Sequence, residues 1–146
     1  MRIILAWLML SATVALGADG PMDYKTAYQK AQEGDKPLLV LVTATWCPPC
    51  QSMKLTTIPE LLSKDAFKEF HYATVDFDAE SELAKKLIGE RGVPQLILFQ
   101  KVDGEWNRRY LAGYQTVARV ESFILEPDIL RTADAKSAAT ITSVDK

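Results

Sequence analysis

The strongest pattern along the chain is an unbroken aliphatic run, Leu38–Val42. Because no polar residue alternates with the apolar ones, the run predicts a strand that is covered on both faces, at the centre of a sheet. A helix is predicted before it, since Asp23 can cap a first turn and Gly34 with Pro37 would end the helix. The domain is therefore expected to begin with a helix that leads into a central strand.

The remaining apolar patterns continue this alternation of helices and strands. We expect a bent or broken helix that starts at Cys47, is interrupted by Pro59 and resumes through Phe70. The pair Asp103-Gly104 predicts a two-residue hairpin turn. The other expected elements are strands at His71–Phe77, Gln95–Lys101 and Trp106–Ala112, and helices at Ser81–Ile88 and Val117–Leu125. This order predicts an α/β fold, a central mixed β-sheet flanked by helices.

The N-terminal residues have the pattern of a signal peptide. Arg2 precedes a 14-residue apolar run, Ile3–Leu16, and small residues follow at Gly17 and Ala18. The run is shorter than the roughly 20 residues that a membrane-spanning helix needs. We therefore expect residues 1–17 to be removed, and the mature protein, which would not span a membrane, to be secreted or periplasmic. An uncleaved membrane anchor or a buried first helix is the alternative.

Composition limits what the rest of the chain can be. The 146 residues suffice for one domain, which we place at residues 18–126, and 48% of them are hydrophobic, enough to form a core. We expect residues 127–146 to be a flexible tail, because Thr132–Lys146 has no aromatic side chain and few large aliphatic ones. The 17 Lys and Arg against 19 Asp and Glu argue against nucleic acid as a partner. We expect a monomer.

The candidate chemistry lies in Trp46-Cys47-Pro48-Pro49-Cys50, where the buried strand ends and a helix begins. At a helix N-terminus, free N–H groups and the helix dipole favour the thiolate of Cys47. Two intervening residues bring Cys50 within bonding range, so that it can attack a mixed disulfide formed by Cys47. The motif therefore predicts thiol-disulfide exchange with Cys47 as nucleophile and Cys50 as resolving thiol.

Over roughly Tyr24–Leu125 the sequence resembles the thioredoxin superfamily. The resemblance rests on the aliphatic strand that runs into Trp46-Cys47-Pro48-Pro49-Cys50, on Arg91-Gly92-Val93-Pro94 followed by Gln95-Leu96-Ile97-Leu98-Phe99, and on Asp103-Gly104 with Gly113. A lone pair of cysteines at this spacing would be weaker evidence, because half of a zinc site has the same spacing. The resemblance implies a thioredoxin fold and a thiol-disulfide oxidoreductase that needs no cofactor.

The resemblance also implies a substrate-binding groove beside the cysteines. It implies a cis peptide bond before Pro94, with backbone groups of Val93 beside Cys47, where an extended substrate segment could pair as an added strand. An ordinary proline at the start of a strand is the alternative. Trp46 could shield the disulfide and contact substrate, or it could serve packing alone.

Several positions depart from the pattern of ordinary thioredoxins. The buried acid that the family often places six residues before the first cysteine falls on Leu41, and the lysine that accompanies it falls on Thr74. Proton removal from Cys50 must then use water or another group. Pro48 and Pro49 support the site by fixing the helix start, but they offer the thiolate no N–H, which argues against a strong oxidase. The pattern looks closer to exported thioredoxin-like reductases and to terminal domains of membrane-linked electron carriers.

We therefore expect a protein-disulfide reductase of an extracytoplasmic compartment. Its substrates would be protein or small-molecule disulfides, and its partner an unidentified thiol electron donor or acceptor. Two alternatives stay open: a disulfide oxidase or isomerase on the same fold, and a non-enzymatic metal-binding or adaptor domain. We expect no metal, because a zinc site needs about four ligands and His71 is the only histidine.

Overall fold

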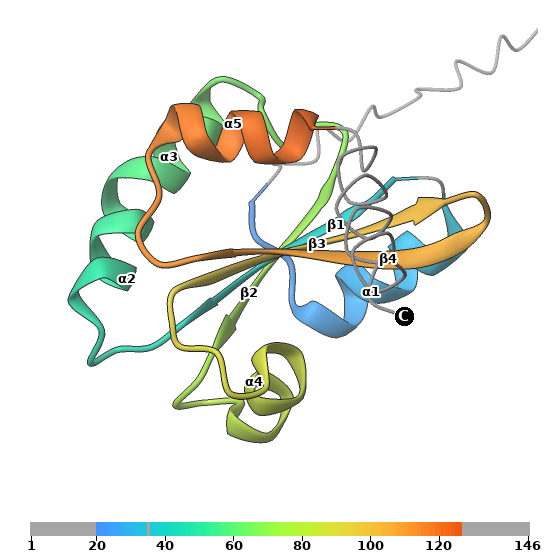
Figure 1. Ribbon diagram of the computed structural model, residues 1–146. Coiled ribbons are helices and arrows are strands. Elements are labelled where there is room, and N and C mark those ends of the chain that lie inside the picture. Colours follow the sequence, from blue (N-terminus) through green and yellow to red (C-terminus); the bar gives the residue numbers. More distant parts are fainter. Residues whose placement is uncertain (1–19, 35, 127–146) are drawn as a thin grey trace, which may run out of the picture.

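The computed structural model describes residues 20–34 and 36–126 (Figure 1). The expected signal peptide at residues 1–17 and the expected tail at residues 127–146 lie outside the described residues. Within the described part, no helix is both long and apolar enough to cross a membrane. The elements are α1 (Tyr24–Glu33), β1 (Leu38–Thr43), α2 (Pro48–Ser52), the π-helical turn η1 (Met53–Thr57), α3 (Ile58–Ser63), β2 (His71–Asp76), α4 (Ser81–Ile88), β3 (Gln95–Val102), β4 (Glu105–Ala112) and α5 (Val117–Leu125).

The strands form one mixed sheet in the order β2-β1-β3-β4. β1 runs parallel to β2, with Leu38 beside His71, and antiparallel to β3, with Leu38 beside Phe99. β3 and β4 are antiparallel neighbours. All six residues of β1 are buried, so the prediction of a central strand covered on both faces is confirmed.

Side chains of β1 alternate between two apolar cores, one on each face of the sheet. Leu39 and Leu41 pack into the core that contains buried side chains of η1, α3 and α5. Val40 and Val42 pack into the other core, with buried side chains of α1 and α4. In Figure 1, α2, α3 and α5 accordingly lie on one side of the sheet, and α1 and α4 on the other. Each fully buried side chain of this size contributes roughly 1.5–3 kcal/mol, so the two cores together fix the position of β1.

The helical segment after the cysteines is irregular in the middle and ends early. α2 gives way to η1, and Pro59 stands in the first turn of α3, where its missing N–H is tolerated. The regular α-helical pattern therefore changes before Pro59, although the backbone stays helical from α2 through α3. The prediction that the helix resumes through Phe70 is wrong, because α3 ends at Ser63. Asp65 adopts a φ of 53°, a left-handed conformation through which a right-handed helix does not continue.

Asp103 and Gly104 form the two-residue turn between β3 and β4. Both have positive φ, 53° and 84°, the combination found in type I′ turns, whose twist suits an antiparallel pair. The predicted hairpin is confirmed. It brings the end of β4 back to the start of β3, where the Gly113 N–H donates to the Pro94 carbonyl oxygen at 2.8 Å.

Candidate functional site

Cys47 caps the N-terminus of α2. Its Sγ accepts a hydrogen bond from the Cys50 N–H at 3.2 Å, and Pro48 and Pro49 occupy the first helical positions. The same Cys50 N–H also donates to the Cys47 carbonyl oxygen at 3.1 Å. Because the two prolines have no N–H, the sulfur depends on a backbone donor that it shares with a carbonyl oxygen.

The structure holds the cysteines as a disulfide. The Cα atoms of Cys47 and Cys50 are 5.2 Å apart. Cys50 is fully buried, whereas Cys47 is 4% exposed. Both pack with the buried Ala44, and the half-buried Phe77 and Val93 complete this small cluster. Cys47 is therefore the more exposed of two buried cysteines.

Asp78, which the sequence pattern alone did not single out, anchors the residues just before Cys47. Its Oδ2 accepts hydrogen bonds from the Thr45 N–H at 2.9 Å and from the Thr45 hydroxyl at 2.6 Å. Its Oδ1 accepts from Trp46 Nε1 at 2.9 Å. Trp46 also meets Phe77 edge to face, with ring centroids 6.5 Å apart, yet its side chain remains 64% exposed. The indole is thus held in one position on the surface beside the disulfide.

The pKa of Asp78 is lowered from its ordinary value of 3.8, chiefly by the hydroxyl and the N–H of Thr45 and also by the indole of Trp46. All of these donors bind the charged carboxylate, and hydrogen bonds to a charged acceptor are the stronger kind. A topological signal could have pointed to this residue. β1 and β2 are parallel and end together, with Thr43 beside Asp76, so the residues that follow each strand meet at one edge of the sheet.

The peptide bond between Val93 and Pro94 is cis, as the resemblance implied. Pro94 is buried, and its carbonyl oxygen is held by the Gly113 N–H. Val93 is half-buried and packs against the cluster of Ala44 and the two cysteines. The structure thus brings Val93 to the disulfide, with Pro94 next to it in the chain, and β3 begins directly after them.

Leu41 and Thr74 lie side by side on β1 and β2, where the family often keeps an acid and a lysine. Leu41 is fully buried. The Thr74 hydroxyl donates to the hydroxyl of Tyr72 at 3.2 Å. Burial raises the pKa of Tyr72 to about 12, so this phenol stays protonated near neutral pH and cannot serve as a base. Neither position offers a carboxylate for proton transfer.

Comparison with known proteins agrees with this geometry. Residues 20–101 match a family described as thioredoxin-like. The match covers more than half of the chain and includes both cysteines, Trp46 and Pro94. The chain belongs to the thioredoxin-like family. Its fold is the thioredoxin fold, and its cysteine pair is that of a thiol-disulfide oxidoreductase.

The similar proteins include thioredoxins of fungi, bacteria, archaea and protists. The thioredoxin Asp f 29 of Aspergillus fumigatus is 35% identical over 83 residues, which are 57% of this chain and 72% of that protein. A thioredoxin of Alicyclobacillus acidocaldarius is 32% identical over 95 residues, which are 65% of this chain and 85% of that one. Among solved structures, a mutant thioredoxin of Halobacterium salinarum is 26% identical, with a TM-score of 0.57 over 75% of this chain and 96% of its own. The thioredoxin of Trypanosoma brucei brucei is 19% identical, with a TM-score of 0.58 over 80% of this chain and 96% of its own, and shows the fold alone.

The side chains of this thioredoxin-like protein supply thiol chemistry at the site. Among the described residues, no three His, Cys, Asp or Glu side chains gather where they could hold a metal ion. The groups beside the disulfide are an exposed indole, the backbone around a cis proline, and a surface carboxylate that orients the indole.

Replacing Asp78 with Asn should loosen Trp46. The variant lacks the charged carboxylate, whose two oxygens accept three hydrogen bonds at 2.6–2.9 Å in the wild type. In the wild type the folded-state pKa lies below 3.8, so the stabilisation is complete above that pH and is lost as the pH falls through the folded-state pKa. Quenching of Trp46 fluorescence by acrylamide should therefore increase on acidification below pH 3.8 in the wild type. In Asp78→Asn it should already be high at neutral pH.

The control for this prediction is Glu80→Gln, which removes an exposed acid two residues away. The fluorescence of Trp46→Phe comes from the other two tryptophans, and it is subtracted from that of the other proteins to isolate the fluorescence of Trp46. If Asp78→Asn and Glu80→Gln both kept the pH profile of the wild type, Asp78 would not be what holds the indole.

Proposed function

We propose that the protein is a protein-disulfide reductase of an extracytoplasmic compartment, with Cys47 as the attacking thiol and Cys50 as the resolving thiol. The observation that carries the assignment of the two thiols is the position of Cys47, which caps α2 and is 4% exposed, whereas Cys50 is fully buried. A nucleophile needs both access and a field that favours its thiolate. Only the first cysteine has both.

The proposed reaction moves two electrons in two displacements. The Cys47 thiolate attacks one sulfur of a substrate disulfide, so that the substrate bond breaks, a mixed disulfide forms and one substrate thiolate leaves. Cys50, deprotonated to its thiolate, then attacks Cys47 Sγ. The mixed disulfide breaks, the second substrate thiolate leaves, and the Cys47–Cys50 disulfide seen in the structure forms. A dithiol donor restores the reduced protein by the reverse exchange.

The surroundings of the disulfide support binding of an extended substrate segment. Val93 packs against the cysteines, and the neighbouring Pro94 fixes the backbone at the start of β3. A substrate strand can pair with free backbone groups at such a place, which gives affinity without demanding one substrate sequence. Trp46, exposed but bound to Asp78, offers an apolar surface directly before Cys47 in the chain. These three residues form the proposed substrate groove.

The donors around Cys47 favour the reducing direction. Strong oxidases stabilise the reduced form through the thiolate of their first cysteine. Here Pro48 and Pro49 have no N–H to donate to the sulfur. The Cys50 N–H is shared between Cys47 Sγ and the Cys47 carbonyl oxygen. A less stabilised thiolate disfavours the reduced form relative to the disulfide, so the dithiol gives up its electrons more readily.

The extracytoplasmic location rests on the N-terminal sequence. Arg2, the 14-residue apolar run and the small residues at positions 17 and 18 fit a cleaved leader. In an oxidising compartment a reductase depends on a supply of electrons. The proposal therefore includes a thiol donor that reaches this compartment.

Trapping of substrates tests the roles of the two cysteines. With Cys50→Ser the second displacement cannot occur. Mixed disulfides between Cys47 and a substrate protein should therefore accumulate when the substrate is offered in its unfolded, disulfide-bonded form. Cys47→Ser should give at least about tenfold less adduct, because its remaining thiol is buried. Adducts can be counted on non-reducing gels and located by peptide mass spectrometry. Equal adduct with both variants would overturn the assignment.

The reduction potential, measured against glutathione, tests the direction. A reductase should lie near the value of about −270 mV typical of thioredoxin, and an oxidase nearer to about −120 mV. Pro49→Ala restores the N–H at the second helical position, which an N-cap side chain commonly accepts. It should raise the potential by about 10–30 mV through a better stabilised thiolate. Pro48→Ala restores an N–H one position too early and should change the potential less. A wild-type potential near the oxidase value would contradict the reductase role.

A further inference from the structure

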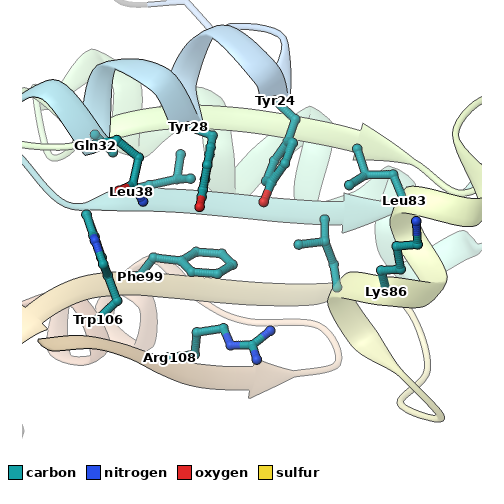
Figure 2. A pocket seen from close by; sticks show the side chains of 11 residues that line it. Tyr24, Tyr28, Gln32, Leu38, Leu83, Lys86, Phe99, Trp106 and Arg108 are labelled. Atoms are coloured by element: carbon teal, nitrogen blue, oxygen red, sulfur yellow. The ribbon is translucent and has the colours of Figure 1, made fainter.

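A slot lies on the face of the sheet that carries α1 and α4, away from the cysteines (Figure 2). Its volume is about 470 Å³, within the usual range for sites that bind small molecules. Leu38 and Phe99, paired at the start of β1, both line it, whereas Cys47 follows the other end of β1. At about 3.3 Å per residue, β1 spans roughly 17 Å from Leu38, which lines the slot, to Thr43, which precedes the cysteine motif. A ligand here would not compete with a substrate at Cys47.

Aromatic rings form the two long walls of the slot. On one side, Tyr24 and Tyr28 of α1 stack with ring centroids 5.8 Å apart and an angle of 22° between their planes. On the other side, Phe99 comes from β3 and Trp106 from β4. Figure 2 shows both tyrosine rings reaching from α1 toward the strand that carries Phe99, with their hydroxyl groups leading. A flat ring can enter between these walls and make stacked or edge-to-face contacts.

The charged side chains that line the slot are cationic among the residues that the structure describes. They are Lys86 of α4 and Arg108 of β4, and no described Asp or Glu lines the slot. The adjacent Lys85 pairs with Glu82 at 3.2 Å, whereas Lys86 makes no such ion pair among the described residues. The Arg108 guanidinium lies 5.9 Å from the Phe99 ring centroid, and its charge counteracts the rise in the pKa of Tyr24 that burial causes. Positive charge therefore reaches the phenol groups inside the slot.

We propose that this slot binds a small aromatic carboxylate, with the ring between Tyr28 and Phe99 and the carboxylate directed to Lys86. The aromatic walls favour a planar apolar body, and Lys86, which makes no ion pair among the described residues, favours an anion over a cation or a neutral molecule. The tyrosine hydroxyls can donate hydrogen bonds to the carboxylate oxygens.

A pair of probes that differ in charge alone tests the proposal. Naphthalene-2-carboxylate and its neutral amide, naphthalene-2-carboxamide, are titrated into the oxidised full-length chain, with binding measured by calorimetry and located by amide NMR shifts. The carboxylate should saturate one site with a Kd below about 1 mM, and the amide should bind at least about tenfold more weakly. Added salt should weaken the binding of the carboxylate but not the binding of the amide. The shifts should gather at α1, Phe99 and Trp106.

Variants connect the binding to the named residues. Lys86→Gln should weaken the binding of the carboxylate about tenfold and leave the binding of the amide unchanged. The matched control Lys85→Gln, one residue away, should change the binding of neither probe. Tyr28→Ala should weaken both probes, and because Tyr28 is 41% exposed the fold should tolerate the change, which the amide spectrum verifies. The proposal fails if the carboxylate does not saturate, if it binds no better than the amide, if Lys86→Gln behaves like Lys85→Gln, or if the shifts gather at Trp46 and Pro94.

Discussion

The burial of β1 on both faces is the constraint on which the redox site depends. β1 lies inside the sheet, with β2 parallel on one side and β3 antiparallel on the other, and two apolar cores hold it from above and below. Strand pairing places its end beside the end of β2 and the start of β3, with Thr43 next to Asp76 and Val42 next to Gln95. Cys47, Asp78 and the Val93–Pro94 peptide follow or precede those strands, so they meet at one edge of the sheet. The position of the proposed substrate groove therefore follows from the strand order.

The charged group of the site lies on the surface, apart from the apolar core. A buried carboxylate at position 41 would lose hydration and need a buried partner, and a leucine beside Thr74 avoids both costs. Charge is placed on the surface instead, where Asp78 can remain ionised while it orients Thr45 and Trp46. The core can then pack with apolar side chains alone around β1. The consequence is that the proton of Cys50 has no acceptor on Leu41 or Thr74.

The parts of the structure that local patterns determine could be predicted from the sequence. The aliphatic β1, the amphipathic α4 and α5, and the Asp103-Gly104 turn each carry their own signal, and all are confirmed. The early end of α3 was missed because it depends on the left-handed conformation of Asp65, which propensity alone does not reveal. Asp78 was missed because its partners lie more than 30 residues away and meet it only when β1 pairs with β2. The cis bond before Pro94 followed from the family resemblance, since most such bonds are trans.

The central claim is that Cys47 attacks because it caps α2, while Cys50 is buried behind it. The most direct test is the pH dependence of alkylation of the reduced full-length chain by iodoacetamide, with each modified cysteine identified by peptide mass spectrometry. Cys47 should react first, with an apparent pKa below the ordinary thiol value of about 8.5 and well above the value of about 3.5 found in a strong oxidase. Cys50 should react at least about tenfold more slowly. If Cys50 reacted first, or if both thiols titrated together near 8.5, the assignment of the nucleophile would be contradicted.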